Sequence, residues 1–139
     1  MKNKIFDCIT FFDNNFMFDL RYNILKDFVD FFVVCESKYD HNGNEKKINF
    51  FIKEEYQKDK IKHIVMEEKF PDDSSGWQKQ AMQRDYLLQN LDNASSEDYI
   101  FFSDPDEIPK PELLTNFELN KKYGIFFQKC FNYKFNLFN

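Results

Sequence analysis

The sequence is poor in the glycine motifs that build phosphate loops and nucleophile elbows. It holds only 3 glycines among 139 residues, and none of them belongs to a GxGxxG, a Walker-type loop or a GxSxG. These three motifs define dinucleotide-binding, P-loop and serine-hydrolase sites, so none of these classes has support in the sequence. Internal repeats and low-complexity linkers are also absent.

Cysteine pairs and targeting signals are lacking as well. Cys8, Cys35 and Cys130 are widely spaced, form no CxxC, and lie in apolar runs, so we expect small buried hydrophobes in a reducing compartment. The N-terminus begins basic and turns apolar, but Asp7 interrupts the run and no small-residue cleavage site follows. We expect no signal peptide, no membrane span and a cytoplasmic location.

Excess positive charge is missing too. Lys and Arg number 19 against 24 Asp and Glu, a net charge of -5, which argues against nucleic acid as a main partner. With 42% hydrophobic and 31% charged residues, the chain is ordinary globular material, expected as one domain over 1–139. The 19 phenylalanines are interpreted as core filler, with sugar-stacking platforms as the alternative.

Apolar runs and helical patterns alternate along the chain. Phe16, Leu20, Ile24 and Phe28 recur every four residues, which predicts a helix with one apolar face. This order predicts an α/β fold with a mostly parallel sheet flanked by helices. The expected strands are 4–12, 29–36, 61–67 and 99–102, the expected helices are 16–28, 77–91 and a short one from Pro111, and a last apolar run covers 123–131.

An acidic cluster follows the fourth expected strand. Asp104, Asp106 and Glu107 come directly after "YIFFS", and Pro105 and Pro109 stiffen the segment. Ligands of open α/β sheets bind beyond the carboxyl ends of strands. Carboxylates packed this closely repel one another, and oxygen ligands favour Mg²⁺ or Mn²⁺, so Asp104 and Asp106 are candidate metal ligands. The alternative is that one of them only caps the following turn.

Arg84 falls inside the apolar stripe of the 77–91 helix. The stripe consists of Trp77, Ala81, Leu87, Leu88 and Leu91. An inward guanidinium needs an anion, and we expect a carboxylate of the acidic cluster or a metal-bound phosphate. Snorkelling to solvent is the alternative.

Four further residues are weaker candidates. Asp13 and Glu36 end the first two expected strands, so they belong to the same sheet edge, with loop capping as the alternative role. His41 and His63 lie far apart, and neither is favoured as a catalytic base.

Four segments in order resemble glycosyltransferase family 17, which includes the β-1,4-mannosyl-glycoprotein β-1,4-N-acetylglucosaminyltransferases. The most specific piece, Ser103 to Pro109, is similar to the family's SDxDEIP signature, and the likeness runs from about Ile5 over nearly the whole chain. The segments are "IFDCITFFDN", "LRYNILKDFVDFFVVCES", a Trp followed by "QRDYL", and "IFFSDPDEIPKP".

The resemblance implies a GT-A-like fold whose nucleotide-sugar-binding half is Rossmann-like. Asp104 and Asp106 match the DxD that holds a divalent metal against the donor diphosphate, and Glu107 is its acidic neighbour. Arg84 matches an Arg of the preceding helix, and Glu36 matches the acidic residue ending the second strand. The implied reaction is inverting transfer from UDP-N-acetylglucosamine to a glycan acceptor.

The general base of such a reaction remains unassigned. In the family, the acceptor half follows the DxD segment, whereas no Asp or Glu follows Glu118 in this sequence. We therefore expect a chain truncated at its C-terminus, completed by another polypeptide or a homo-oligomer, or binding a donor without efficient transfer. The leading interpretation is a metal-dependent glycosyltransferase. The alternatives are a non-catalytic nucleotide-sugar or metal-binding module and a structural α/β domain.

Overall fold

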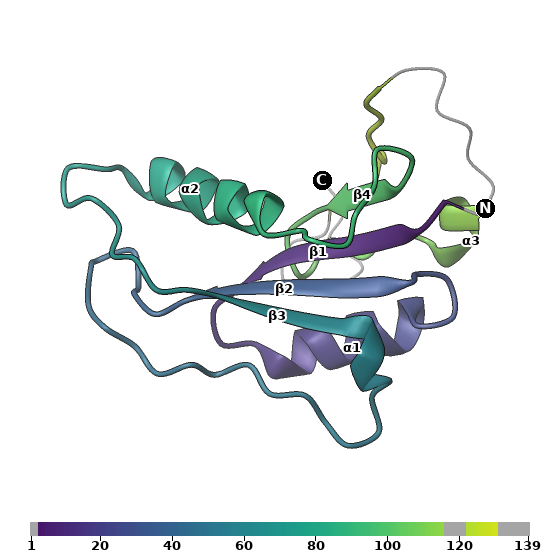
Figure 1. Ribbon diagram of the computed structural model, residues 1–139, viewed down its shortest axis with the longest axis horizontal. Helices are drawn as coiled ribbons and strands as arrows, with labels where there is room; N and C mark the ends of the chain where they lie inside the picture. The colour runs from purple at the N-terminus through teal and green to yellow at the C-terminus, as the bar shows by residue number, and fades with distance from the viewer. Residues whose placement is uncertain (1–2, 116–121, 131–139) are drawn as a thin grey trace.

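Four parallel strands form the sheet at the centre of the protein. The computed structural model describes residues 3–115 and 122–130. Its sheet has the order β3-β2-β1-β4 with every pairing parallel (Figure 1), which confirms the predicted α/β, Rossmann-like fold. The elements are β1 (Ile5–Phe11), α1 (Asn15–Leu25), β2 (Phe31–Ser37), η1 (Lys58–Lys60), β3 (Ile61–Met66), α2 (Gly76–Gln89), β4 (Tyr99–Phe102) and α3 (Pro111–Thr115).

The two central strands owe their position to continuous apolar sequence. β1 and β2 are buried at nearly every residue, as expected for strands covered on both faces. β1 pairs with β2 on one side and with β4 on the other. The segments that follow β1, β2 and β4 therefore meet at one edge of the sheet.

Helices α1 and α2 cover opposite faces of the sheet (Figure 1). On one face, α1 packs Phe18 and Tyr22 against Phe32 of β2, and on the other, α2 packs Leu87 against Cys8 of β1. The chain runs outward from β1 to β2 and β3, then crosses back to place β4 on the far side of β1. Such a reversal of strand order leaves a crevice at the carboxyl ends of the strands.

Three of the four residues in the apolar stripe that the sequence singled out face solvent, while the fourth, Phe28, follows α1 and packs against the core. Phe16 is 75% exposed, Leu20 42% and Ile24 37%, although the helix itself was predicted to within a few residues. Both stripes of α1 have helical spacing, so periodicity alone cannot choose between them. Phe50 and Tyr56 of a distant segment pack on Phe18 and select the other stripe. The buried residues of α1 are Phe18, Arg21, Tyr22 and Leu25.

The predicted inward stripe of α2 is wrong for most of its members. Trp77 is 83% exposed and Leu88 45%, whereas Leu87 is fully buried. The buried face is polar over the first turns, where Lys79 and Gln83 donate to main-chain oxygens of His41 (2.7 Å) and Cys35 (2.9 Å). These turns lie over strand ends and a loop, whose carbonyl oxygens need donors rather than apolar cover. Ser75 and Gln78 form a capping box at the start of α2.

The last described segment, 122–130, has no regular secondary structure and is exposed. Cys130 is exposed, so its predicted burial is wrong, while Cys8 and Cys35 are buried as expected. Phe126 stacks on Phe101 of β4, with ring centroids 5.4 Å apart. Residue 131, the end of the predicted apolar run, lies outside the described residues. Within the described ranges, no helix combines the length and apolarity that a bilayer crossing requires.

Candidate active site

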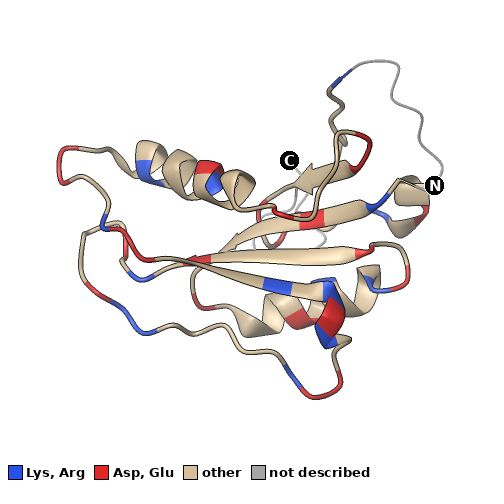
Figure 2. Ribbon diagram, in the orientation of Figure 1, with Lys and Arg blue, Asp and Glu red and all other residues tan. Residues whose placement is uncertain are grey.

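A cleft of about 690 Å³ opens at the carboxyl edge of the sheet. It lies where the strand order reverses, the position at which open α/β sheets bind ligands. The residues after β1, β2 and β4 line it, together with Gln80 and Gln83 of α2. Its acidic residues are Asp13, Asp40, Asp104 and Asp106. Elsewhere, acidic and basic positions are interspersed around the molecule (Figure 2).

Both predicted metal ligands line the cleft. Asp106 is exposed, and its side chain has no hydrogen-bond or ion-pair partner within 3–115 and 122–130. Glu107 turns back on its own loop, where Oε2 accepts a 3.0 Å bond from the Asp104 amide. The amide of Glu107 in turn donates to the Asp104 carbonyl at 2.9 Å. Glu107 therefore caps this loop, and its predicted role in donor binding stays a prediction.

Arg84 pairs with the acidic cluster, as the sequence analysis predicted. Its Nη2 donates to Asp104 Oδ1 at 2.8 Å, and the two side chains are 37% and 41% exposed. The guanidinium also lies over the Phe102 ring, 5.2 Å from its centroid. Its buried Nε has no hydrogen-bond partner among the described residues. Arg84 does not itself line the cleft, so its contact with the site runs through the ion pair with Asp104.

A buried ion pair behind the cleft was missed by the sequence analysis. Asp7 of β1 is 2% exposed and Arg21 of α1 is fully buried. Arg21 Nε and Nη2 donate to Asp7 Oδ2 and Oδ1 at 2.7 and 2.6 Å, a bidentate geometry. The available signal was an acidic residue inside an apolar strand, which needs a buried cation as partner. Asp7 had been interpreted only as an interruption of an apolar run.

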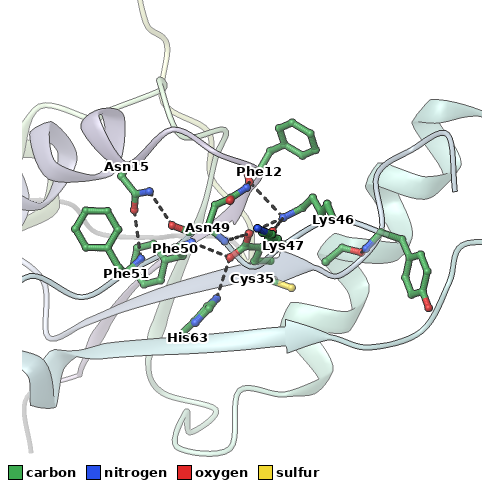
Figure 3. A network of polar contacts seen from close by, with 12 residues as sticks. Phe12, Asn15, Cys35, Lys46, Lys47, Asn49, Phe50, Phe51 and His63 are labelled. Atoms are coloured by element: carbon green, nitrogen blue, oxygen red, sulfur yellow. Dashed lines mark hydrogen bonds and ion pairs between the residues drawn. The ribbon is translucent and has the colours of Figure 1, made fainter. Parts of the chain in front are cut away.

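Glu36, predicted to bind the donor, is fully buried and has internal partners. Its Oε1 accepts from Lys46 Nζ at 2.5 Å and from the Asn49 amide at 2.8 Å, and Oε2 accepts from the Phe50 amide at 3.0 Å. Lys46, Asn49 and Phe50 thus bind this carboxylate and His63 lies beside it, and Figure 3 shows these four residues close together. The geometry is that of the alternative role, loop capping, and donor binding by Glu36 stays a prediction.

The two histidines differ in their positions. His41 lines the cleft, with its ring edge-on to Phe70 at 5.5 Å. His63 Nε2 is buried 3.3 Å from Glu36 Oε2 but has no hydrogen bond of acceptable geometry among the described residues. Burial lowers the pKa of His63, and the Glu36 charge opposes that shift. His63 therefore belongs to the Glu36 network and not to the cleft.

The two buried thiols, Cys8 and Cys35, do not provide a nucleophile for the cleft. Burial raises the pKa of Cys8, and it raises that of Cys35 to about 12. Both thiols stay protonated at neutral pH, and the thiolate is the reactive form.

The cleft suits a hard divalent cation held jointly with a ligand. Within the described ranges, no three His, Cys, Asp or Glu side chains gather as a complete metal-binding group. Mg²⁺ is commonly bound through one or two carboxylates, with waters and substrate phosphates as the other ligands. Asp104 and Asp106 fit that pattern because both reach the cleft and Asp106 has no internal partner among the described residues.

The parallel sheet, the helices on both faces and the cleft at the reversal of strand order place the protein among the Rossmann-like α/β domains. More narrowly, the chain belongs to glycosyltransferase family 17, whose family pattern matches residues 1–131. This membership implies a glycosyltransferase of the N-acetylglucosaminyltransferase group. Comparison with curated proteins and with solved structures finds no match.

Proposed function

We propose that the protein transfers N-acetylglucosamine, or a related sugar, from a UDP-sugar to a glycan acceptor. In this proposal Mn²⁺ or Mg²⁺ is held by Asp104 and Asp106. The observation that carries the proposal is the position of these two carboxylates in the cleft, with the Arg84 guanidinium bound to Asp104. Membership of family 17 supports the reaction class.

The chain's own residues have distinct tasks in this reaction. Asp104 and Asp106 would hold the divalent cation, which would supply Lewis-acid stabilisation of the negative charge that develops on the leaving diphosphate. Asp104 and Asp106 supply hard oxygen ligands. Arg84 fixes one oxygen of Asp104, and its charge adds positive potential near the cleft. Asp13, exposed on the same cleft, is a further donor-binding candidate.

The alternative is a module that binds a nucleotide sugar without transferring it. Transfer needs a general base for the acceptor hydroxyl. Among the cleft carboxylates, Asp40 accepts three hydrogen bonds from Asn42 and Asn44, and such bonds hold its pKa below its usual range. A carboxylate engaged in this way is a poor base. If a second polypeptide or another copy of the chain supplied the base, this chain would bind the donor and the assembly would carry out the transfer.

Thermal unfolding in four conditions tests donor binding: no additive, Mn²⁺ alone, UDP-N-acetylglucosamine alone, and both together. The melting temperature should rise clearly only with both, because in this proposal the two carboxylates would hold the cation jointly with the donor. A ligand at 100 times its Kd stabilises by about 2.7 kcal/mol. Asp106→Asn should abolish the joint shift without lowering the melting temperature of the free protein. Asp92→Asn is the matched control, because Asp92 is an exposed turn residue between α2 and β4, at the opposite edge of the sheet.

Two results would count against the proposal. An Asp106→Asn variant that keeps the full joint shift would remove the metal assignment. If the wild-type protein shows no joint shift, UDP-sugar binding is ruled out. Release of UDP with a panel of sugar acceptors then separates transferase from binding module: sustained turnover identifies an enzyme, and donor binding without turnover favours the module.

A further inference from the structure

One buried guanidinium holds the main chain of the segment that carries the candidate metal ligands. We call residues 103–107 the acidic loop. Arg21 Nη1 donates to the carbonyl oxygens of Asp104, Pro105 and Glu107 at 3.1, 3.3 and 3.2 Å. Its Nη2 donates to Ser103 Oγ at 2.7 Å. These contacts span 82 to 86 residues of sequence, so the first helix fixes a loop far along the chain.

Every nitrogen of this guanidinium is engaged. Arginine presents five N–H groups in a rigid planar fork. Nε and one side of Nη2 bind the Asp7 carboxylate, and the remaining donors face the acidic loop. Asp7 supplies the negative charge that a fully buried guanidinium requires. Arg21 thus links the central strand β1 to the acidic loop through hydrogen bonds alone.

The acidic loop closes around the guanidinium. Ser103 Oγ donates to the Glu107 carbonyl at 3.1 Å, which joins the two ends of the loop. The Asp104 and Glu107 amides are satisfied inside the loop. With its carbonyls directed to Arg21 and these amides paired internally, the loop has little freedom to rearrange. The carboxylates of Asp104 and Asp106 are left to line the cleft.

We propose that Arg21 and Asp7 are positioning residues for the site that binds the metal and the diphosphate, a role that rests on the proposed function. Neither residue lines the cleft, so both act through the loop. By holding three carbonyl oxygens, Arg21 fixes the main chain that carries Asp104 and Asp106 before the donor arrives. Preorganisation of this kind raises affinity because binding no longer has to order the loop.

Arg21→Lys separates positioning from simple stabilisation of the fold. A lysine ammonium can pair with Asp7, but it is a single point with three donors and cannot also hold three carbonyls and a hydroxyl. Tyr22→Phe is the matched control. Tyr22 neighbours Arg21 in α1, is buried, and accepts a 2.7 Å bond from the Gln57 amide, which lies in a different segment. Both variants lose buried hydrogen bonds, but only the first touches the acidic loop.

Hydrogen exchange of the ligand-free protein is the primary readout. The Asp104 and Glu107 amides should exchange about tenfold faster, or more, in Arg21→Lys than in wild type, relative to the Val34 amide of β2, because the loop loses charge-assisted hydrogen bonds. Ser103→Ala removes only the hydroxyl that joins the loop ends and should accelerate the same amides to a smaller extent. Tyr22→Phe should leave their relative rates unchanged. Equal acceleration in Arg21→Lys, Ser103→Ala and Tyr22→Phe would overturn the positioning role.

Metal titration supplies the second readout. The Mn²⁺ concentration that gives half of the thermal shift with UDP-N-acetylglucosamine should rise about tenfold in Arg21→Lys and stay unchanged in Tyr22→Phe. If the wild-type protein binds and Arg21→Lys binds equally well, the positioning role is wrong. If the wild-type protein does not bind at all, the proposed function is wrong, whereas the exchange experiment needs no ligand. The two failures are therefore distinguishable.

Discussion

The guanidinium of Arg84 and the carboxylate of Asp104 join α2 to the acidic loop through a 2.8 Å contact between Nη2 and Oδ1. Both side chains are more than one third exposed, so water screens their attraction. We expect Arg84→Met to lower the free energy of unfolding by about 1 kcal/mol or less, with a coupling to Asp104→Asn of about 0.2–1 kcal/mol. The measurement is a double-mutant cycle by urea unfolding.

The same Arg84→Met variant should weaken binding far more than stability. The joint shift with Mn²⁺ and UDP-N-acetylglucosamine should fall, because the variant loses the positive charge that holds Asp104 at the proposed donor site. Arg84→Lys, which keeps the charge but not the fork, should give an intermediate shift. If Arg84→Met kept the full shift, Arg84 would have no role in donor binding beyond its surface ion pair with Asp104.

The two neighbouring phenylalanines of α1 should differ sharply in their contribution to stability. Phe18 is 1% exposed and Phe16 is 75% exposed. Phe18→Ala should cost about 3–5 kcal/mol, since it opens a cavity in the aromatic cluster. Phe16→Ala should change stability by no more than about 0.5 kcal/mol. Denaturant unfolding of both variants decides which stripe faces the core, and a larger loss for Phe16→Ala would contradict this packing.

Removing the Glu36 carboxylate should destabilise the segment that follows β2. Glu36→Ala leaves two main-chain amides without their acceptor and the Lys46 ammonium without its counter-charge, at a cost of about 3–5 kcal/mol. Glu36→Gln keeps an acceptor oxygen and should cost about 1.5–3 kcal/mol. Glu67→Gln is the control, because the ion pair of Glu67 with Lys38 is exposed. If a folded Glu36→Gln variant instead lost the UDP-sugar shift, Glu36 would belong to the donor site.

His63 should make stability depend on pH in weak acid. Burial lowers the pKa of His63 below its usual 6.5. Below pH 6.5 the unfolded chain binds a proton before the folded protein does, so the free energy of unfolding falls as the pH decreases toward the folded pKa. Above 6.5 both states are neutral and this dependence vanishes. The stability difference between wild type and His63→Gln should therefore shrink on acidification, and a constant difference would show that His63 does not titrate differently on folding.

The fold was predictable because its strongest signals are local. Continuous apolar runs marked β1 and β2, and the Ser75 capping box marked the start of α2. The faces of the helices were not predictable in the same way. α1 has two stripes of helical spacing, and the partners of Phe18 come from Phe50 and Tyr56, far along the chain. Such a choice depends on tertiary packing and leaves no trace in the helix itself.

The candidate site was predictable only in part, for a similar reason. The charge of Arg84, set in an apolar stripe, pointed to an anion, and Asp104 is that anion in the structure. The Arg21–Asp7 pair was missed because α1 also has an exposed apolar stripe. The sequence analysis assigned that stripe to the core, and Arg21 lies on the other face. Glu36 was placed at the correct strand end, but its partners lie in an irregular segment whose path no local pattern specifies.

The reversal of strand order also sets the sequence of events in which the protein can assemble during synthesis. β1, β2 and β3 emerge first and can pair with one another, whereas β4 closes the free edge of β1 only after most of the chain has been made. Until then Arg21 has no carbonyl oxygens from residues 104–107 to hold. A ribosome-bound chain that ends before the fourth strand therefore has a sheet but lacks the proposed cation site, and on this proposal metal binding by nascent chains would report the moment at which β4 docks.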